Sequence, residues 1–440
     1  MPNSKELFLS SQSFGFGPSA ELVNIAKGLR KTSQFEDSQL TFYNTPELQA
    51  IFKLTQAGVK LTTEDTGNDV MEYLSVHKGK NQIDGIISSY DSAAIFYGWF
   101  HDIPTFFYDG MLSFWDVGKF KDEIDPTLYA FQKTKDEQDE AGMINLYRQI
   151  SRDNHHKSIF LAYFLASRNF ARGGDHPERQ LEPFPTLQEK SKIVGGIVNP
   201  EIPADPSLNR DHVLVSMSAS LVPTVTFEQS IEFARNTLSF ATDTAQSTPN
   251  IPWIVAMNPK IYSDLLSSGQ LSHLPSHVQV RESFSSEENL RSIRSANVML
   301  ISPGFSSIHE AAYYRTPVFF LPEQNGGQPV GYTKLKKEGY TSVPNLTFAE
   351  NIGGKTTVDF EEFGMADLYQ MTNRIFTAPE FEEVRANAKR AIHSVLNDST
   401  SANEMGTRQH HSTAQIIGGF DGVGQITRGI GDFFNNFGQL

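Results

Sequence analysis

Residues 298–328, with the sequence VMLISPGFSSIHEAAYYRTPVFFLPEQNGGQ, decide the fold of this protein. The apolar run 298–302 predicts a buried strand, and the turn at Pro303 and Gly304 predicts a helix that begins near Phe305. A second apolar run, 317–321, predicts the next strand. A strand, a helix and a strand in this order are typical of a βαβ unit in a parallel sheet.

The turn between the first strand and the helix has the chemistry of an anion site. Backbone N–H groups at a helix start lack intrahelical partners and lie at the positive end of the helix dipole, which suits a phosphate. Gly304 lets a ligand approach the backbone closely, because it has no Cβ. Ser306 and Ser307 add hydroxyl donors, and Glu310, one turn later, could accept hydrogen bonds from a ribose diol. A turn of this kind also occurs without any ligand.

Glu323 and Gln324 come directly after the second strand. A carboxylate and an amide at the carboxyl end of a parallel strand can bind sugar hydroxyls, because ligands of open α/β sheets lie at that edge. The same residues could also form a surface turn. Their position one βαβ unit after the Gly304 turn favours the binding interpretation.

The rest of the chain repeats this alternation on both sides of a proline-rich linker at 200–210. Strand-like runs occur at 6–11, 39–43, 59–63, 85–89 and 105–108, and again at 212–216, 253–257 and 278–281. Residues 121–172 are predicted to be mainly helical. We therefore expect an α/β protein of two Rossmann-like domains, 1–200 and 211–398, facing each other across a cleft. The glycine-rich residues 399–440 predict a poorly ordered tail.

Composition excludes several classes of protein. The 440 residues carry a formal charge of −14 and no cysteine. The negative charge disfavours nucleic acid and anionic lipid as partners, and the lack of cysteine excludes disulfides, thiolate metal sites and a cysteine nucleophile. No histidine spacing suggests a metal site. No apolar stretch is long enough to span a membrane and no signal-peptide pattern is present, so a cytoplasmic protein is expected.

The segment from Pro303 to Gln324 also resembles the nucleotide-sugar signature of GT-B glycosyltransferases. The most similar types are the family-1 transferases and the lipid-linked N-acetylglucosamine transferases of peptidoglycan synthesis. The resemblance implies that the donor, such as a UDP-sugar, is bound without metal or cofactor by the second domain. It assigns the diphosphate to Gly304, Phe305, Ser306 and Ser307, the ribose to Glu310, and the sugar to Glu323 and Gln324.

Two further loops of the second domain extend the resemblance. The segment 278–284 is similar to the loop that holds the base in that family, which implies contacts near Arg281 and Ser283. The loop with Ser216 and Ser218, after the first strand of the domain, is similar to one that faces the diphosphate. The specific resemblance covers about 120 residues of the second domain, and over the first domain only the rhythm of strands and helices is shared.

The sequence departs from that family at two positions. Pro303 stands where many members have a phosphate-binding histidine. The loop after the first strand, with Gly15, Phe16 and Gly17 on the expected acceptor side, lacks the histidine that often acts as catalytic base. Strand ends of the first domain offer Asp109 first and Asp91 second as replacements. Either aspartate could instead cap the helix that follows it.

Three functions are consistent with this sequence. The first is a glycosyltransferase that moves a sugar from a nucleoside-diphosphate donor to a small-molecule or lipid-like acceptor. The second is a nucleotide-sugar hydrolase or 2-epimerase of the same fold. The third is a non-catalytic relative that binds a nucleotide, because fold-level resemblance does not establish the chemistry.

Overall fold

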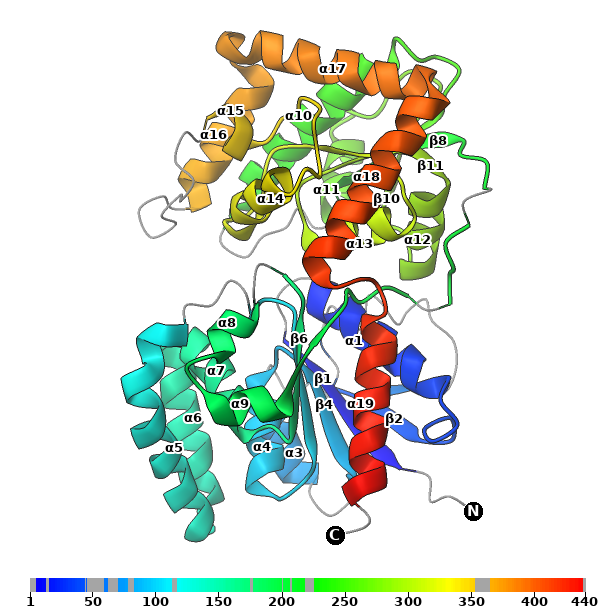
Figure 1. Ribbon diagram of the computed structural model, residues 1–440. Coiled ribbons are helices and arrows are strands. Elements are labelled where there is room, and N and C mark those ends of the chain that lie inside the picture. The colour runs from blue at the N-terminus through cyan, green and yellow to red at the C-terminus, as the bar shows by residue number, and fades with distance from the viewer. Residues whose placement is uncertain are drawn as a thin grey trace. The chain divides into compact units, whose positions relative to one another are not determined.

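The computed structural model describes residues 5–12, 16–43, 45, 59–61, 70–77, 83–112, 117–174, 177–199, 201–205, 208–217, 225–352 and 365–437. The chain divides into two compact units. The N-terminal unit comprises Met1–Glu201 together with Ile416–Leu440, and the C-terminal unit comprises Ile202–Gln415. Each unit is an α/β structure around one parallel sheet, as the alternating pattern predicts (Figure 1).

The N-terminal unit contains a seven-stranded sheet in the order β3-β2-β1-β4-β5-β6-β7. All its neighbouring strands pair in parallel. Five of the seven strands, β1 to β5, lie where the sequence predicts them. Strand β6 was not predicted, because it lies at the end of the stretch 121–172 that was expected to be mainly helical. The strands are β1 (Glu6–Ser11), β2 (Gln39–Phe42), β3 (Val59–Leu61), β4 (Gly85–Ser89), β5 (Thr105–Asp109), β6 (Arg168–Arg172) and β7 (Ser191–Val194).

Helices cover both faces of this sheet, so the strands are apolar on both sides. On one face lie α1 and α19, whose apolar side chains pack with Leu7 and Leu9 of β1. On the other face, α3, α4 and α7 pack with Phe8 of the same strand. The helices of this unit are α1 (Phe16–Arg30), α3 (Val70–His77), α4 (Ser92–Phe100), α5 (Lys121–Asp136), α6 (Glu140–Asp153), α7 (His155–Leu165), α8 (Pro177–Leu181), α9 (Pro185–Lys190), α19 (Gly422–Phe437) and the 3-10 turn η2 (Val117–Phe120).

The C-terminal unit contains a five-stranded parallel sheet in the order β10-β9-β8-β11-β12. Its strands confirm the predicted runs to within two residues at each end: β8 (His212–Met217), β9 (Trp253–Met257), β10 (Val278–Glu282), β11 (Ala296–Ile301) and β12 (Val318–Phe320). The helices are α10 (Phe227–Ala245), α11 (Pro259–Ser267), α12 (Ser286–Ser295), α13 (Phe305–Tyr313), α14 (Gly327–Lys337), α15 (Phe348–Asn351), α16 (Met365–Thr377), α17 (Glu382–Asn397), α18 (Ser399–Ile417) and the 3-10 turn η3 (Pro379–Phe381).

Side chains at the starts of two of these helices show why they begin where they do. Thr226 and Gln229 form a reciprocal capping box before α10, and Ser285 and Glu288 form another before α12. Each box satisfies backbone N–H groups that the first helical turn leaves unpaired. Such caps involve residues only three positions apart in the sequence.

The expectation of a disordered tail is wrong. Residues 399–437 contain the whole of α18 and α19, the two red helices of Figure 1. Helix α19 buries Val423, Ile426 and Ile430 against the N-terminal unit. A Cβ at Gly28 of α1 would lie 2.3 Å from a methyl group of Val423, so the glycine permits the close approach of the two helices. The glycine-rich composition therefore reflects tight helix packing, which composition alone does not distinguish from disorder.

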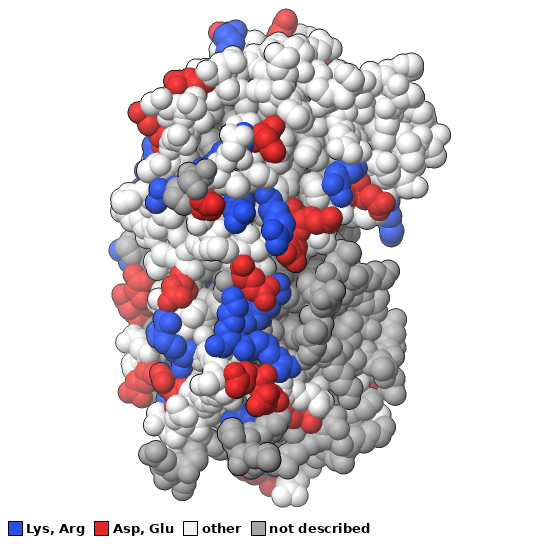
Figure 2. All heavy atoms as spheres, turned by 90° about the vertical axis from the view of Figure 1, so that its right-hand side faces the viewer, with Lys and Arg blue, Asp and Glu red and all other residues white. Residues whose placement is uncertain are grey.

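Two further expectations concern the surface. None of the described helices combines the length and apolar character needed to cross a bilayer. Basic and acidic side chains of the described residues are interspersed on the face drawn in Figure 2. A group of basic side chains in the middle of that face has acidic side chains above and below it.

Candidate functional site

The residues predicted to bind a nucleotide sugar lie at one edge of the C-terminal sheet. In the strand register, Ile301 of β11 stands beside Ser216 of β8 on one side and Phe320 of β12 on the other. Met257 of β9 stands beside Met217 of β8 and Glu282 of β10. The loops that follow these strands therefore begin along the same carboxyl edge, where ligands of open parallel sheets bind.

The turn after β11 has an open helix start. Gly304 is the N-cap of α13, and no side chain caps the helix there. Residues 304–307 are half-exposed, whereas Ile308 and His309 behind them are buried. The first turn of an α-helix leaves its N–H groups without intrahelical partners, and these groups attract anions. This arrangement suits a phosphate at residues 304–307.

The fold itself does not require a glycine at position 304. Its φ of −87° and ψ of 131° are open to any residue. A Cβ added there would meet no heavy atom closer than 3.9 Å. What a side chain at this position would obstruct is the space in front of the helix start, where an anion would approach.

Glu310 lies on the same side of α13 as the open turn, three residues after Ser307 and four after Ser306. Its side chain is half-exposed, whereas its neighbours Ala311 and Ala312 are fully buried. The carboxylate is therefore accessible one turn above the predicted phosphate position, as the ribose prediction requires.

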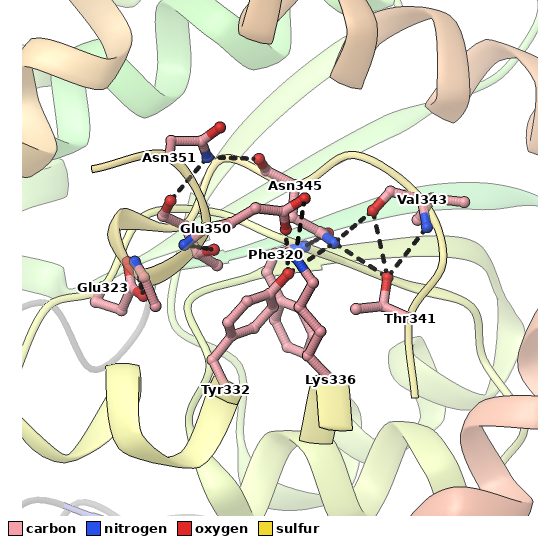
Figure 3. A network of polar contacts seen from close by, with 11 residues as sticks. Phe320, Glu323, Tyr332, Lys336, Thr341, Val343, Asn345, Glu350 and Asn351 are labelled. Carbon is pink, nitrogen blue, oxygen red and sulfur yellow. Dashed lines mark hydrogen bonds and ion pairs between the residues drawn. The ribbon is translucent and has the colours of Figure 1, made fainter. Parts of the chain in front are cut away.

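Glu323 does not lie in an accessible position. Its side chain is fully buried, and its carboxylate accepts hydrogen bonds from the backbone N–H groups of Phe348 and, at 3.1 Å, Ala349. It thereby caps the start of α15 (Figure 3). Burial raises the pKa of Glu323 to about 7, and the two backbone N–H groups oppose that rise. In this conformation the carboxylate stabilises the start of a helix inside the fold.

Gln324 is also engaged within the fold. Only 4% of its surface is exposed. Its side-chain amide donates to Ser302 Oγ at 3.0 Å, and Ser302 in turn donates to the Pro322 carbonyl at 2.6 Å. These bonds join the ends of β11 and β12. The predicted sugar contacts of Glu323 and Gln324 would require both side chains to leave their present partners.

The loop after β10 places an aromatic ring that the sequence analysis did not single out. The guanidinium of Arg281 lies 4.3 Å from the ring centroid of Phe284, and Ser283 donates to the Met257 carbonyl at 2.9 Å. The serine bond fixes this loop to the end of β9. Phe284 is half-exposed, and an aromatic residue directly after a strand end was the signal that could have identified it.

The structure describes only some of the remaining residues that were predicted to contact the donor or the acceptor. Ser216 is half-exposed at the end of β8, while Ser218 and Gly15 lie outside the described residues. Helix α1 begins at Phe16, two residues before the proline expected to open it, and Gly17 lies in its first turn.

The two predicted catalytic aspartates have structural partners. Asp91 is the N-cap of α4 and accepts from the Ala93 N–H at 3.1 Å. Asp109 is fully buried and accepts from the Tyr163 hydroxyl at 2.9 Å and the Met111 N–H at 2.6 Å. Of the two, only Asp91 retains a partly exposed side chain.

A buried ion pair beside Asp109 was not predicted. Arg172 at the end of β6 donates to Glu21 of α1 at 2.9 Å and to the Gly110 carbonyl at 2.5 Å. Both charged side chains are at most 6% exposed. Burial raises the pKa of Glu21, and Arg172 opposes that rise. Because 151 residues separate the partners, no local sequence pattern could reveal the pair.

A cavity of about 340 Å³, lined by described residues, lies elsewhere. Its lining includes Arg168, Asn169, Ser191 and Lys192, which stand at the amino ends of β6 and β7. It therefore occupies the edge of the N-terminal sheet opposite to the one where ligands of such sheets bind. No group of His, Asp or Glu residues in the described part of the chain could hold a metal ion.

Comparison with known proteins shows which solved structures share this architecture. No family model matches the sequence, and no curated protein matches it. Solved structures do match. UDP-bound MnaA of S. aureus has 12% identity over 98% of this chain and 97% of its own, with a TM-score of 0.56. A putative UDP-N-acetylglucosamine 2-epimerase of Listeria monocytogenes has 12% identity over 98% of each chain and a TM-score of 0.58.

A third match has a different activity. The spinosyn rhamnosyltransferase SpnG has 14% identity over 94% of this chain and 96% of its own, with a TM-score of 0.51. Identities this low establish a shared architecture and leave the reaction open. Two Rossmann-like α/β units, matched by these structures over 94–98% of the chain, identify its fold as GT-B.

Proposed function

We propose that this protein is an enzyme that binds a nucleoside-diphosphate sugar at the carboxyl edge of its C-terminal sheet and transfers the sugar to an acceptor. The observation that carries the proposal is the open start of α13. There the helix is uncapped and half-exposed, and it begins with a glycine that the backbone does not need. Close approach of an anion to the backbone would explain why a glycine stands here, because a Cβ would obstruct that approach.

The residues of this edge suit the parts of such a donor. The N–H groups and hydroxyls of Ser306 and Ser307 would bind the diphosphate and stabilise it as it leaves, and Ser216 lies on the neighbouring strand end. Glu310 would bind the ribose. The base would lie by Arg281, Ser283 and the ring of Phe284. UDP is the nucleotide to test first, because it is bound in the S. aureus structure.

Glu323 and Gln324 remain proposed sugar contacts on the resemblance alone. Their present hydrogen bonds mean that binding would have to exchange a backbone partner for a sugar hydroxyl. Asp109, buried as it is, would also have to become exposed in order to act as a base.

Thermal unfolding with nucleotides tests the donor site. UDP should raise the melting temperature of the unmodified protein, because a ligand that binds only the native state stabilises it. Gly304→Ala should keep the melting temperature of the free protein and lose most of the increase with UDP. Glu310→Ala should lose it as well, whereas Glu383→Ala, at an exposed glutamate of α17, should retain it. An undiminished increase in both site variants would remove the proposed site.

A nucleotide-sugar 2-epimerase or hydrolase is the second candidate. The putative 2-epimerase of Listeria monocytogenes matches 98% of this chain with a TM-score of 0.58. MnaA of S. aureus, which is bound to UDP, also matches 98% of it, with a TM-score of 0.56. Incubation with UDP-N-acetylglucosamine and no acceptor separates the candidates. Release of UDP or a changed sugar under these conditions favours the second candidate. UDP release that depends on an added acceptor favours the transferase.

A further inference from the structure

The cavity at the amino edge of the N-terminal sheet has no part in the proposed function. Its volume of about 340 Å³ lies at the lower end of the range for small-molecule sites, which is about 300–1,000 Å³. A volume at this end of the range suits a ligand with a single ring rather than a nucleotide sugar. Every residue that lines the cavity belongs to the N-terminal unit, so the cavity is formed within that unit.

Helix α19 forms one wall of the cavity. Gly429, Asp432, Phe433 and Asn436 line it, and their spacing of three, four and seven residues places them on one face of the helix. A Cβ at Gly429 would lie 2.7 Å from the ring of Phe170 in β6, so the glycine allows α19 to lie directly against that strand. The packing of α19 on the sheet therefore shapes the cavity.

Aromatic rings supply the apolar part of the lining. Phe433 makes edge contacts with Phe106 of β5, at 5.2 Å between ring centroids, and with Phe434, at 5.9 Å. The buried ring of Phe170 lines the cavity from the side of the strand. Because these contacts hold the rings in place, Phe170 and Phe433 offer a preformed surface for a flat, aromatic ligand.

Cationic side chains reach the same space from the two strands. Lys192 of β7 stands beside Phe170 in the strand register, and Arg168 lies two residues before Phe170 on β6. All three side chains therefore point to the face of the sheet that α19 covers. The guanidinium of Arg168 lies 5.9 Å from the centroid of the Phe433 ring. Within the part of the chain that the structure describes, neither Arg168 nor Lys192 forms an ion pair, and both are exposed.

A third cation, Lys190, makes this corner of the cavity more positive. Its ammonium donates to the carbonyls of Phe164 and, at 2.9 Å, Ala166, which holds it at the end of α7. Burial, and then the nearby Arg168, lower the pKa of Lys190 to about 8. An anionic group beside Arg168 would reduce the repulsion between these cations.

Hydrogen-bond acceptors line the cavity as well. Glu189 and Asp432 are both exposed, and Asn436 lies one turn after Asp432 on the same face of α19. Their oxygens could accept from a hydroxyl or an amine of a ligand. The combination of rings, cations and acceptors favours an aromatic acid with a donor group over a bare anion such as phosphate.

We propose that this cavity binds an aromatic carboxylic acid, with its ring against Phe170 and Phe433 and its carboxylate beside Arg168 and Lys192. The site is separate from the proposed donor site at the carboxyl edge of the C-terminal sheet. It does not depend on the proposed function, because its lining shares no residue with that site.

Fluorine NMR with 3-fluoro-4-hydroxyphenylacetate tests the inference, because it detects weak binding by a small ligand. The unmodified protein should bind this acid with a Kd of about 1 mM or lower. The corresponding amide has the same ring and hydroxyl but no charge. It should bind about 10-fold more weakly, since it cannot form charge-assisted hydrogen bonds with the two cations.

Variants at the cavity locate the bound acid. Arg168→Ala and Lys192→Ala should each weaken binding about 5-fold or more. Arg179→Ala, at an exposed arginine of α8 in the same unit, is the matched control and should stay within about 2-fold. UDP should not displace the acid from the unmodified protein.

Four results would overturn the inference. They are no binding at about 10 mM acid, equal binding of the acid and the amide, equal effects of Arg168→Ala and Arg179→Ala, or displacement of the acid by UDP. The comparison of acid and amide uses the unmodified protein, so it remains decisive if a variant folds poorly.

Discussion

Gln409 of α18 makes two hydrogen bonds to the backbone of a single residue, Val318 of β12. Its amide donates to the Val318 carbonyl at 2.9 Å, and its oxygen accepts from the Val318 N–H at 2.8 Å. β12 is an edge strand, whose outer N–H and carbonyl groups lack a strand partner. One side chain from the C-terminal region thus completes the edge of the sheet and ties α18 to it.

Gln409→Ala should therefore destabilise the protein by roughly 2 kcal/mol, because it leaves two buried backbone groups unpaired. The measurement is urea unfolding followed by tryptophan fluorescence. His411→Ala, at an exposed position of the same helix, is the control and should change stability by less than about 0.5 kcal/mol. Equal stability of the two variants would show that the edge bonds contribute nothing.

The contact between Gly28 and Val423 predicts a compensating pair of changes. Gly28→Ala places a Cβ 2.3 Å from the Val423 methyl group and should cost about 1–3 kcal/mol by overpacking. In the Val423→Ala background the same change should cost markedly less. A double-mutant cycle of unfolding free energies measures this coupling, and a coupling near zero would argue against the packing of α19 on α1.

Glu21 and Arg172 form a buried ion pair, so removal of one charge leaves the other buried without its partner. Arg172→Met leaves the Glu21 carboxylate buried without its partner and should cost about 3–5 kcal/mol. Glu21→Leu combined with Arg172→Met removes both charges and should be less damaging than Arg172→Met alone. Thermal unfolding of the three variants checks the order of stabilities. A single Arg172→Met variant as stable as the unmodified protein would contradict the pairing.

Glu323 predicts a pH dependence of stability. Its pKa of about 7 in the folded protein exceeds the ordinary 4.5, so the folded state holds the proton more tightly than the unfolded state. Stability contributed by this group is complete below about pH 4.5 and is lost as the pH rises to about 7, by up to roughly 3 kcal/mol.

Urea unfolding at pH 5 and pH 7.5 measures this change. Glu323→Gln cannot titrate and should show a smaller loss of stability between the two values than the unmodified protein. Glu338→Gln, at an exposed position after α14, should leave the loss unchanged. The same pH dependence in all three proteins would show that Glu323 has no raised pKa.

Local sequence patterns predicted the regular elements of this fold well. The runs at β9, β11 and β12 are apolar, and capping residues such as Thr226 and Ser285 stand at helix starts. Strand β6 escaped prediction, because its sequence, RNFAR, contains two arginines and an asparagine. One of those arginines, Arg172, is buried only because Glu21 of α1 pairs with it.

By itself the sequence determined the two α/β units, their parallel strands and the open, glycine-started helix at Phe305, because each depends on residues within a few positions of one another. Only the tertiary structure decided that residues 399–437 form two packed helices, that Glu323 caps α15, and that His155 lies beside Gln12 at the end of β1. The physical reason is that these outcomes rest on contacts between residues 25 to more than 300 positions apart. No local pattern of polarity or propensity specifies such contacts until the chain has folded.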